Sequence, residues 1–98
     1  MPEVLSAETV GRELSTLDGW TGDEHEITRT AKLPSFPTAI AVVDRVADVA
    51  EEMDHHPDID IRWRTLTFRC ATHSAGGVTE LDLGLAARIN ELAAVGGG

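Results

Sequence analysis

Three of the four histidines lie in two short segments, and imidazole is the side chain best suited to proton transfer near neutral pH. His55 and His56 are adjacent and precede Pro57, whereas His73 follows later in the chain. Because imidazole titrates near neutrality, one ring can donate a proton while another accepts one at the same pH. The sequence therefore indicates a candidate acid/base site, provided that the fold brings the two segments together.

Carboxylates accompany these histidines. Glu51 and Asp54 lie within about one helical turn of the pair, and Asp82 follows His73. Each also has a purely structural interpretation: Asp82 fits the third position of a capping box that starts at Thr79, and Glu51 fits a solvated helix face. A histidine near a helix C-terminus also interacts favourably with the helix dipole.

A metal site is the main chemical alternative. Three histidines with a carboxylate form a recognised ligand set. However, adjacent residues such as His55 and His56 point in different directions on most backbones, so we expect acid/base chemistry without a metal. Cys70 falls in the apolar phase of its segment, and we expect a core residue rather than a nucleophile.

Composition narrows the classes of partner. The chain has 98 residues, of which 42% are hydrophobic and 26% charged, which is too apolar for a disordered protein. Eight basic and seventeen acidic side chains give a formal charge of −9, which disfavours binding to nucleic acid or to an anionic membrane. A single cysteine excludes an internal disulfide.

The N-terminal residues lack the basic region and apolar core of a secretory signal, and no apolar stretch is long enough to span a membrane. We therefore expect a cytoplasmic protein. Residues 1–95 are expected to form a single domain, and residues 96–98 a disordered glycine tail.

Hydrophobic periodicity predicts helices at residues 6–17, 36–54 and from about 80 onward, and strands at about 20, 26–33, 58–63 and 66–73. A two-residue turn at Arg64-Thr65 explains a change in the phase of alternation between the last two strands. The expected fold is an α+β domain in the order α-β-β-α-β-β-α, with three helices on one face of a four-stranded antiparallel sheet. The final hairpin then returns His73 to the level of His55 and His56.

The long helix carries two apolar stripes. The first consists of Ile40, Val43, Ala47 and Ala50, and the second of Val42, Val46, Val49 and Met53. We expect one stripe to pack on the sheet and the other to meet a helix or a second subunit.

The spacing of these residues resembles the signature of the pterin-4a-carbinolamine dehydratase family. That signature has an acid, three residues, His-His-Pro, an aromatic, a later histidine and an aspartate. Here it is matched by Glu51, by the segment His55–Pro57, and by Trp63, His73 and Asp82. The Gly-Trp at residues 19–20 and the loop at residues 72–79 also resemble the family, over about residues 5–92.

The resemblance implies a lyase without metal or cofactor that dehydrates 4a-hydroxytetrahydrobiopterin to quinonoid dihydropterin. It implies His55 and His73 as acid/base groups and His56 as a pterin-binding residue. Glu51 and Asp54 would orient imidazoles, and Asp82 would support His73 or its loop. The family often has an aromatic residue two positions after His-His-Pro, where this chain has Ile59.

Other interpretations follow from the same resemblance. Family members commonly form homodimers or homotetramers, and some also bind a regulatory protein partner, for which the second stripe is a candidate surface. An enzyme acting on a different pterin is a further alternative.

Overall fold

Antiparallel hairpins build the sheet that positions the candidate site. The sheet order is β1-β2-β4-β3, and each neighbouring pair is antiparallel. The computed structural model describes residues 2–98, with the elements α1 (Ala7–Leu14), β1 (Trp20–Gly22), β2 (Ile27–Lys32), α2 (Phe36–Met53), β3 (Asp58–Arg62), β4 (Thr65–Cys70) and α3 (Glu80–Val95). The predicted α+β architecture and element order are confirmed.

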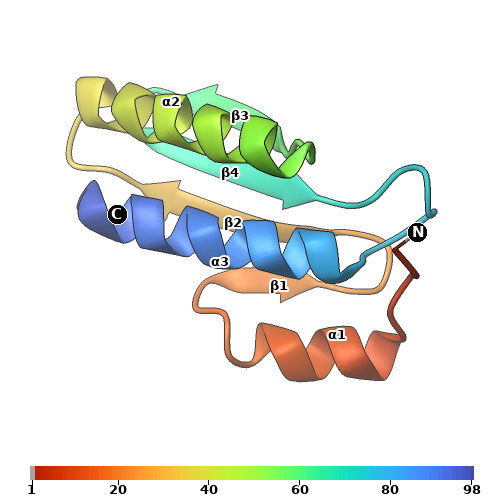
Figure 1. Cartoon of the computed structure of the whole chain (residues 1–98). Helices are drawn as coiled ribbons and strands as arrows, with labels where there is room; N and C mark the ends of the chain where they lie inside the picture. The colour runs from red at the N-terminus through yellow and green to blue at the C-terminus, as the bar shows by residue number, and fades with distance from the viewer. Residues whose placement is uncertain (1) are drawn as a thin grey trace.

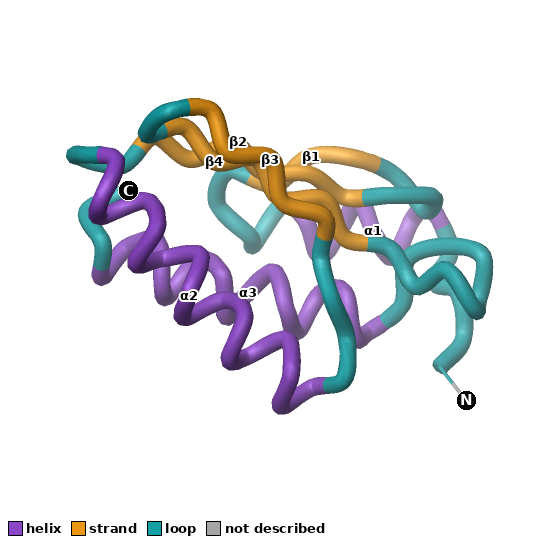
Figure 2. Tube along the Cα trace, turned by 90° about the horizontal axis from the view of Figure 1, so that it is seen from above, coloured by secondary structure: helices purple, strands orange, loops and turns teal. Residues whose placement is uncertain are grey.

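Helices and strands form two layers. Figure 2 shows α2 and α3 on one side of the sheet, and Figure 1 shows α1 alongside the edge strand β1. Because successive side chains of a strand point to opposite faces, alternate residues of the central strands enter the core. The largest buried side chains include Ile27, Leu66, Phe68, Leu85 and Ile89. The opposite face of β2 and β4 carries threonines, which include a hydrogen-bonded pair at Thr30 and Thr67.

Each helix begins after a serine or threonine that caps its first turn. The Ser6 hydroxyl accepts the Thr9 N–H at 3.1 Å, and the Ser35 hydroxyl accepts the Thr38 N–H at 3.2 Å. Helix α3 begins with the predicted capping box of Thr79 and Asp82. Side-chain oxygens at these positions satisfy N–H groups that a first helical turn leaves unpaired.

Two predicted boundaries are wrong. Helix α1 ends at Leu14 rather than at Leu17, because the chain tightens into turns in which the Leu17 N–H bonds to the Leu14 carbonyl. Strand β4 ends at Cys70 rather than at His73. The chain there folds into a loop that an isolated bridge between Thr72 and Gly77 closes.

The predicted position of the β3–β4 turn is also wrong by one residue. Arg62 pairs with Thr65, so the turn is Trp63-Arg64 rather than Arg64-Thr65. Trp63 adopts a left-handed backbone with φ of 54° and is 70% exposed, so it leaves the face that Ile59 and Ile61 share. A two-residue hairpin requires such a conformation because it must follow the twist of the flanking strands.

The second stripe of α2 is not a free surface. Val42, Val46 and Val49 are at most 5% exposed and belong to the core, with Met53 packed against them. These residues therefore cannot serve as the docking surface for a protein partner that the sequence suggested. Ile40 and Val43 of the first stripe are only partly buried, and Ala47 is exposed.

Among the described residues, no helix combines the length and apolarity needed to cross a membrane.

The glycine tail at residues 96–98 continues the last turn of α3. The N–H groups of Gly97 and Gly98 bond to the carbonyls of Ala94 and Ala93.

Candidate active site

The candidate site lies where α2 ends and α3 begins. Figure 1 shows the end of α2, the loop after β4 and the first turn of α3 at the same end of the molecule. Asp54 ends α2 in a left-handed conformation, with φ of 50°. The His55 N–H then bonds to the Ala50 carbonyl at 3.0 Å, so the chain turns as it leaves the helix, and His55 is buried.

His55 forms a buried pair with Asp82. Its side chain is 10% exposed and that of Asp82 is 0% exposed, and Nε2 of His55 lies 2.5 Å from Oδ1 of Asp82. A carboxylate that binds one ring nitrogen fixes the orientation of the imidazole and decides which nitrogen carries the proton. The pair thus holds one candidate catalytic histidine in a defined position.

The second oxygen of Asp82 binds the loop that precedes α3. Oδ2 accepts the Thr72 hydroxyl at 2.8 Å and the Thr79 N–H at 2.9 Å. Charged groups are rarely fully buried unless they are hydrogen-bonded or paired, and the N-terminal end of a helix favours negative charge. Both conditions hold here, so a buried carboxylate is tolerated at this position.

His73 lies next to this network without entering it. It directly follows Thr72, its side chain is exposed, and it makes no side-chain hydrogen bond to another residue within 2–98. The loop bonds that surround it are between backbone groups, as in the Gly76 N–H to His73 carbonyl contact at 3.1 Å. The two histidine segments therefore meet at Asp82, from opposite sides of its carboxylate.

His56 has a different partner and a different environment. Its Nε2 lies 2.5 Å from Oε2 of Glu51, and both side chains are more than half exposed. Exposed ion pairs contribute little to stability, so this contact matters more for the orientation of the ring than for the fold. The Asp54 side chain forms no hydrogen bond or ion pair with an imidazole in the part of the chain that the structure describes.

Cys70 lies close to the site but has an unreactive thiol. Burial, and secondarily the negative charge of Asp82, raise the pKa of its thiol to about 12. Since the thiolate is the nucleophilic form, Cys70 takes no covalent role near neutral pH. This agrees with its predicted place in the core.

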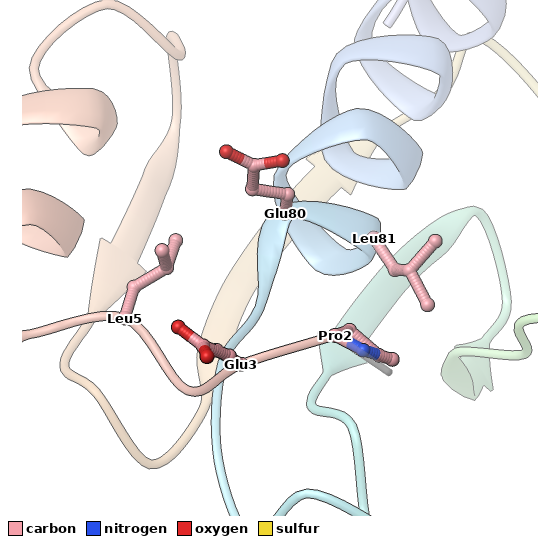
Figure 3. Close-up of a pocket in the computed structure, with 5 residues that line it drawn as sticks. All are labelled: Pro2, Glu3, Leu5, Glu80 and Leu81. Atoms are coloured by element: carbon pink, nitrogen blue, oxygen red, sulfur yellow. The ribbon is translucent and has the colours of Figure 1, made fainter.

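Within residues 2–98, no three side chains of the types that ligate metals are grouped so as to hold a metal ion. A surface pocket of ≈ 360 Å³ lies between the N-terminal segment and the first turn of α3 (Figure 3), lined by Pro2, Glu3, Leu5, Glu80 and Leu81. None of the predicted site residues lines it, although Leu81 precedes Asp82 directly.

Sequence reasoning named His55 and Asp82 but did not pair them, because Asp82 was expected to support His73 or its loop. It also missed the hydroxyl of Thr72. Thr79 was recognised only as a helix cap. Spacing alone gave no signal for Thr72, because nothing in a sequence specifies that a hydroxyl and a carboxylate ten residues apart meet in the core.

Comparisons with known proteins point to one family. The family profile described as "Pterin 4 alpha carbinolamine dehydratase" matches residues 3–92. A protein of Nocardia farcinica is 57% identical over 91 residues, which is 93% of this chain and 96% of that protein. One of Roseiflexus castenholzii is 50% identical over 92 residues, which is 94% of this chain and 99% of that protein. Both carry the provisional name pterin-4-alpha-carbinolamine dehydratase.

Solved structures agree. The transcriptional coactivator/pterin dehydratase of Brucella melitensis matches with a TM-score of 0.87 and 36% identity, covering 91% of this chain and 97% of that chain. A pterin dehydratase-like protein described as a RuBisCO assembly factor in the alpha-carboxysome shares the fold, with a TM-score of 0.62 and 23% identity over 76% of this chain and 86% of that chain. With a match over more than nine-tenths of its length in both sequence and fold, the chain belongs to the pterin-4a-carbinolamine dehydratase family.

Proposed function

We propose that the protein dehydrates a 4a-hydroxytetrahydropterin to the quinonoid dihydropterin and so helps to recycle the reduced pterin. The observation that carries this proposal is the buried carboxylate of Asp82. It binds His55 through one oxygen and the residue before His73 through the other. Two candidate acid/base groups from distant segments are thereby held at one end of the fold.

The chemistry of the reaction requires two proton transfers. The C4a–O bond of the carbinolamine breaks with its electrons on oxygen, and a proton must reach that oxygen because hydroxide is a poor leaving group. The lone pair of N5 forms the C4a=N5 double bond as water departs. A ring N–H then loses its proton to a base. Positioned acid/base groups typically accelerate such steps about 10²–10⁴-fold.

In this proposal His55 and His73 are the acid/base pair. His55 is held by Asp82, whereas His73 is exposed and free to approach a ligand. His56, oriented by Glu51, binds the polar edge of the pterin. Asp54 contributes the backbone turn that separates the environments of the two adjacent histidines.

The decisive experiment follows the loss of the 4a-adduct absorbance, with and without purified protein. We expect His55→Ala and His73→Ala each to reduce the protein-assisted rate by about 10²-fold. His25→Ala is the matched control, because His25 is exposed in the β1–β2 turn and its ring contacts the neighbouring Glu24. Adducts with two different pterin side chains would distinguish the biopterin substrate from another pterin.

An assisted rate that both alanine variants retain would contradict the proposed mechanism. A wild-type protein that accelerates neither adduct would contradict the proposed function itself.

We also propose that the protein forms a homodimer through β3, which is an edge strand of the sheet. Edge strands leave backbone N–H and C=O groups unpaired, and proteins usually protect them. Here β3 instead exposes Ile61 by 42%, beside Trp63 at 70%.

The sequence of β3 is complementary to itself in one antiparallel register. With Ile61 opposite Ile61 of the second copy, Asp60 of each copy lies opposite Arg62 of the other. Directly opposite residues of an antiparallel pair share a face, so these apolar and opposite-charge contacts add to the new backbone bonds. Asp60 and Arg62 already pair within one chain at 3.1 Å, and both would join a cluster of alternating charge.

A further inference from the structure

We infer that Thr72 and Thr79 are positioning residues that aim Asp82 at His55, so that Nδ1 of His55 is the atom that exchanges protons with a ligand. The catalytic part of this inference rests on the proposed dehydratase function, whereas the assignment of the tautomer does not. Both parts depend on the donors and acceptors along one buried chain of hydrogen bonds.

The direction of that chain is fixed by its two ends. At one end, the Leu81 N–H donates to Oγ1 of Thr79 at 3.2 Å. At the other end, Oδ2 of Asp82 accepts two donors, as a carboxylate oxygen does, and a carboxylate has no hydrogen to donate. The single hydroxyl hydrogen of Thr72 goes to Oδ2 of Asp82. The Thr79 hydroxyl must therefore donate to Oγ1 of Thr72, across 2.7 Å.

Two donors then occupy the same oxygen of Asp82. Oδ2 receives the Thr72 hydroxyl and the Thr79 N–H, and both donors lie between the end of β4 and the start of α3. These two hydrogen bonds fix the orientation of the carboxyl group and leave Oδ1 to bind His55. Because Oδ1 can only accept, Nε2 of His55 carries the proton in this contact.

The neutral ring of His55 consequently has its lone pair on Nδ1. Within residues 2–98, Nδ1 makes no hydrogen bond, and it is not among the fully buried polar atoms that lack a partner. It therefore retains access to solvent or to a ligand. As Nδ1–H of the imidazolium it can protonate a leaving hydroxyl, and as neutral Nδ1 it can accept a proton. Asp82 keeps Nε2 protonated in both states.

Ring nitrogen NMR of protein labelled with ¹⁵N-histidine tests the tautomer directly in the wild-type protein. In the pH range where the rings are neutral, we expect the slowly exchanging ring of His55 to show a protonated Nε2 and an unprotonated Nδ1. A protonated Nδ1 would overturn the inference without any variant. His55→Gln serves to assign the resonance.

Asp82→Asn provides the sharper variant. The donors of Thr72 and Thr79 require the oxygen of the new amide at the position of Oδ2, which turns its NH₂ group toward Nε2 of His55. We expect His55 to change to the Nδ1–H tautomer, as an aspartate-to-asparagine change does for a catalytic histidine elsewhere. An unchanged tautomer in a folded Asp82→Asn protein would contradict the role of the two donors.

Thr72→Val and Thr72→Ser separate positioning from packing. Without the hydroxyl, Asp82 has one donor fewer and is a stronger acceptor, so we expect the Nε2–H proton resonance of His55 to move to lower field. We also expect kcat to fall about tenfold at nearly constant KM, which corresponds to the loss of one hydrogen bond. Thr72→Ser should restore both values.

The outcomes distinguish the two proposals. A Thr72→Val protein with an unchanged resonance and full activity would overturn the positioning role. A wild-type protein with the expected tautomer but no dehydratase activity would instead contradict the proposed function, and the assignment of the proton to Nε2 would stand.

Discussion

Adjacent residues at the end of α2 have opposite environments. His55 is buried against Asp82, whereas His56 is exposed beside Glu51. The left-handed backbone of Asp54 causes this difference, because it reverses the chain within one residue. Spacing and residue type predicted that both histidines matter. They did not predict which of the two is buried, since that depends on how the chain leaves the helix.

Cys70 yields a prediction about alkaline pH. Its folded pKa of about 12 lies above the ordinary thiol value of about 8.5, so the thiol form is preferred in the folded state. The contribution of Cys70 to stability should therefore be constant below about pH 8.5 and fall by at most about 1.4 kcal/mol per pH unit between about pH 9 and 12. Urea unfolding at several pH values measures this slope.

Cys70→Ala is the control for that slope. The chain has no tyrosine and a single lysine, Lys32, so few other groups titrate in this range. A slope that persists in Cys70→Ala would assign it to another group. In the native wild-type protein, a thiol reagent at about pH 8 should react with Cys70 only after unfolding.

At the scale of the element, the start of α3 combines two tasks. The capping box that begins the helix uses one oxygen of Asp82, and the histidine contact uses the other. The sequence predicted the box because its spacing is local. It could not predict the second use of Asp82, because that contact joins residues that are remote in the chain.

Loss of the Thr79 hydroxyl should be more costly than loss of an ordinary cap. Thr79 is 0% exposed, and its hydroxyl also binds Thr72, so Thr79→Ala leaves buried polar groups without partners. We expect a loss of about 2–3 kcal/mol in the free energy of unfolding. Ser6→Ala, at the exposed cap of α1, should cost about 0.5–1 kcal/mol. Equal losses in urea unfolding would contradict the coupling of the cap to the buried network.

Element boundaries were predicted less well than the elements themselves. Periodicity identified all helices and strands, because the core selects apolar residues at regular intervals. The ends of α1 and β4 and the turn at Trp63-Arg64 differed from expectation. In each case a local turn, stabilised by backbone hydrogen bonds or by pairing register, ends the element where side-chain pattern alone gives no signal.

At the scale of the whole molecule, one sheet edge is exposed next to the segment that carries the histidines. Strand β3 follows Pro57 directly, so a second copy paired with β3 would lie close to the site. The stripe of α2 that the sequence offered as a docking surface is instead buried between sheet and helices. Hydrophobic periodicity could not show which of these two surfaces is exposed, because both have similar apolar patterns.

Ile61→Lys tests the dimer. A lysine at the centre of the proposed register would place two like charges opposite each other, which disfavours pairing. We expect light scattering to show a dimer for the wild-type protein and a monomer for Ile61→Lys. Val95→Lys is the matched control, since Val95 is an apolar residue of α3 that is 79% exposed and far from β3 in sequence. A wild-type monomer, or a dimer that survives Ile61→Lys, would contradict the proposed interface.

The loop that carries His73 is hydrogen-bonded to two segments that are remote from it in sequence. The Leu5 N–H bonds to the Val78 carbonyl at 2.8 Å, and the Val78 N–H bonds to the Glu24 carbonyl at 2.8 Å. A side chain at Gly77 would lie 2.6 Å from that carbonyl. The segment at Leu5 is thus bonded to a loop that is far from it in sequence and that carries a candidate catalytic histidine. An affinity tag fused ahead of residue 2 would disturb the backbone bond between Leu5 and Val78. A tag after Gly98 is therefore the safer choice for kinetic work.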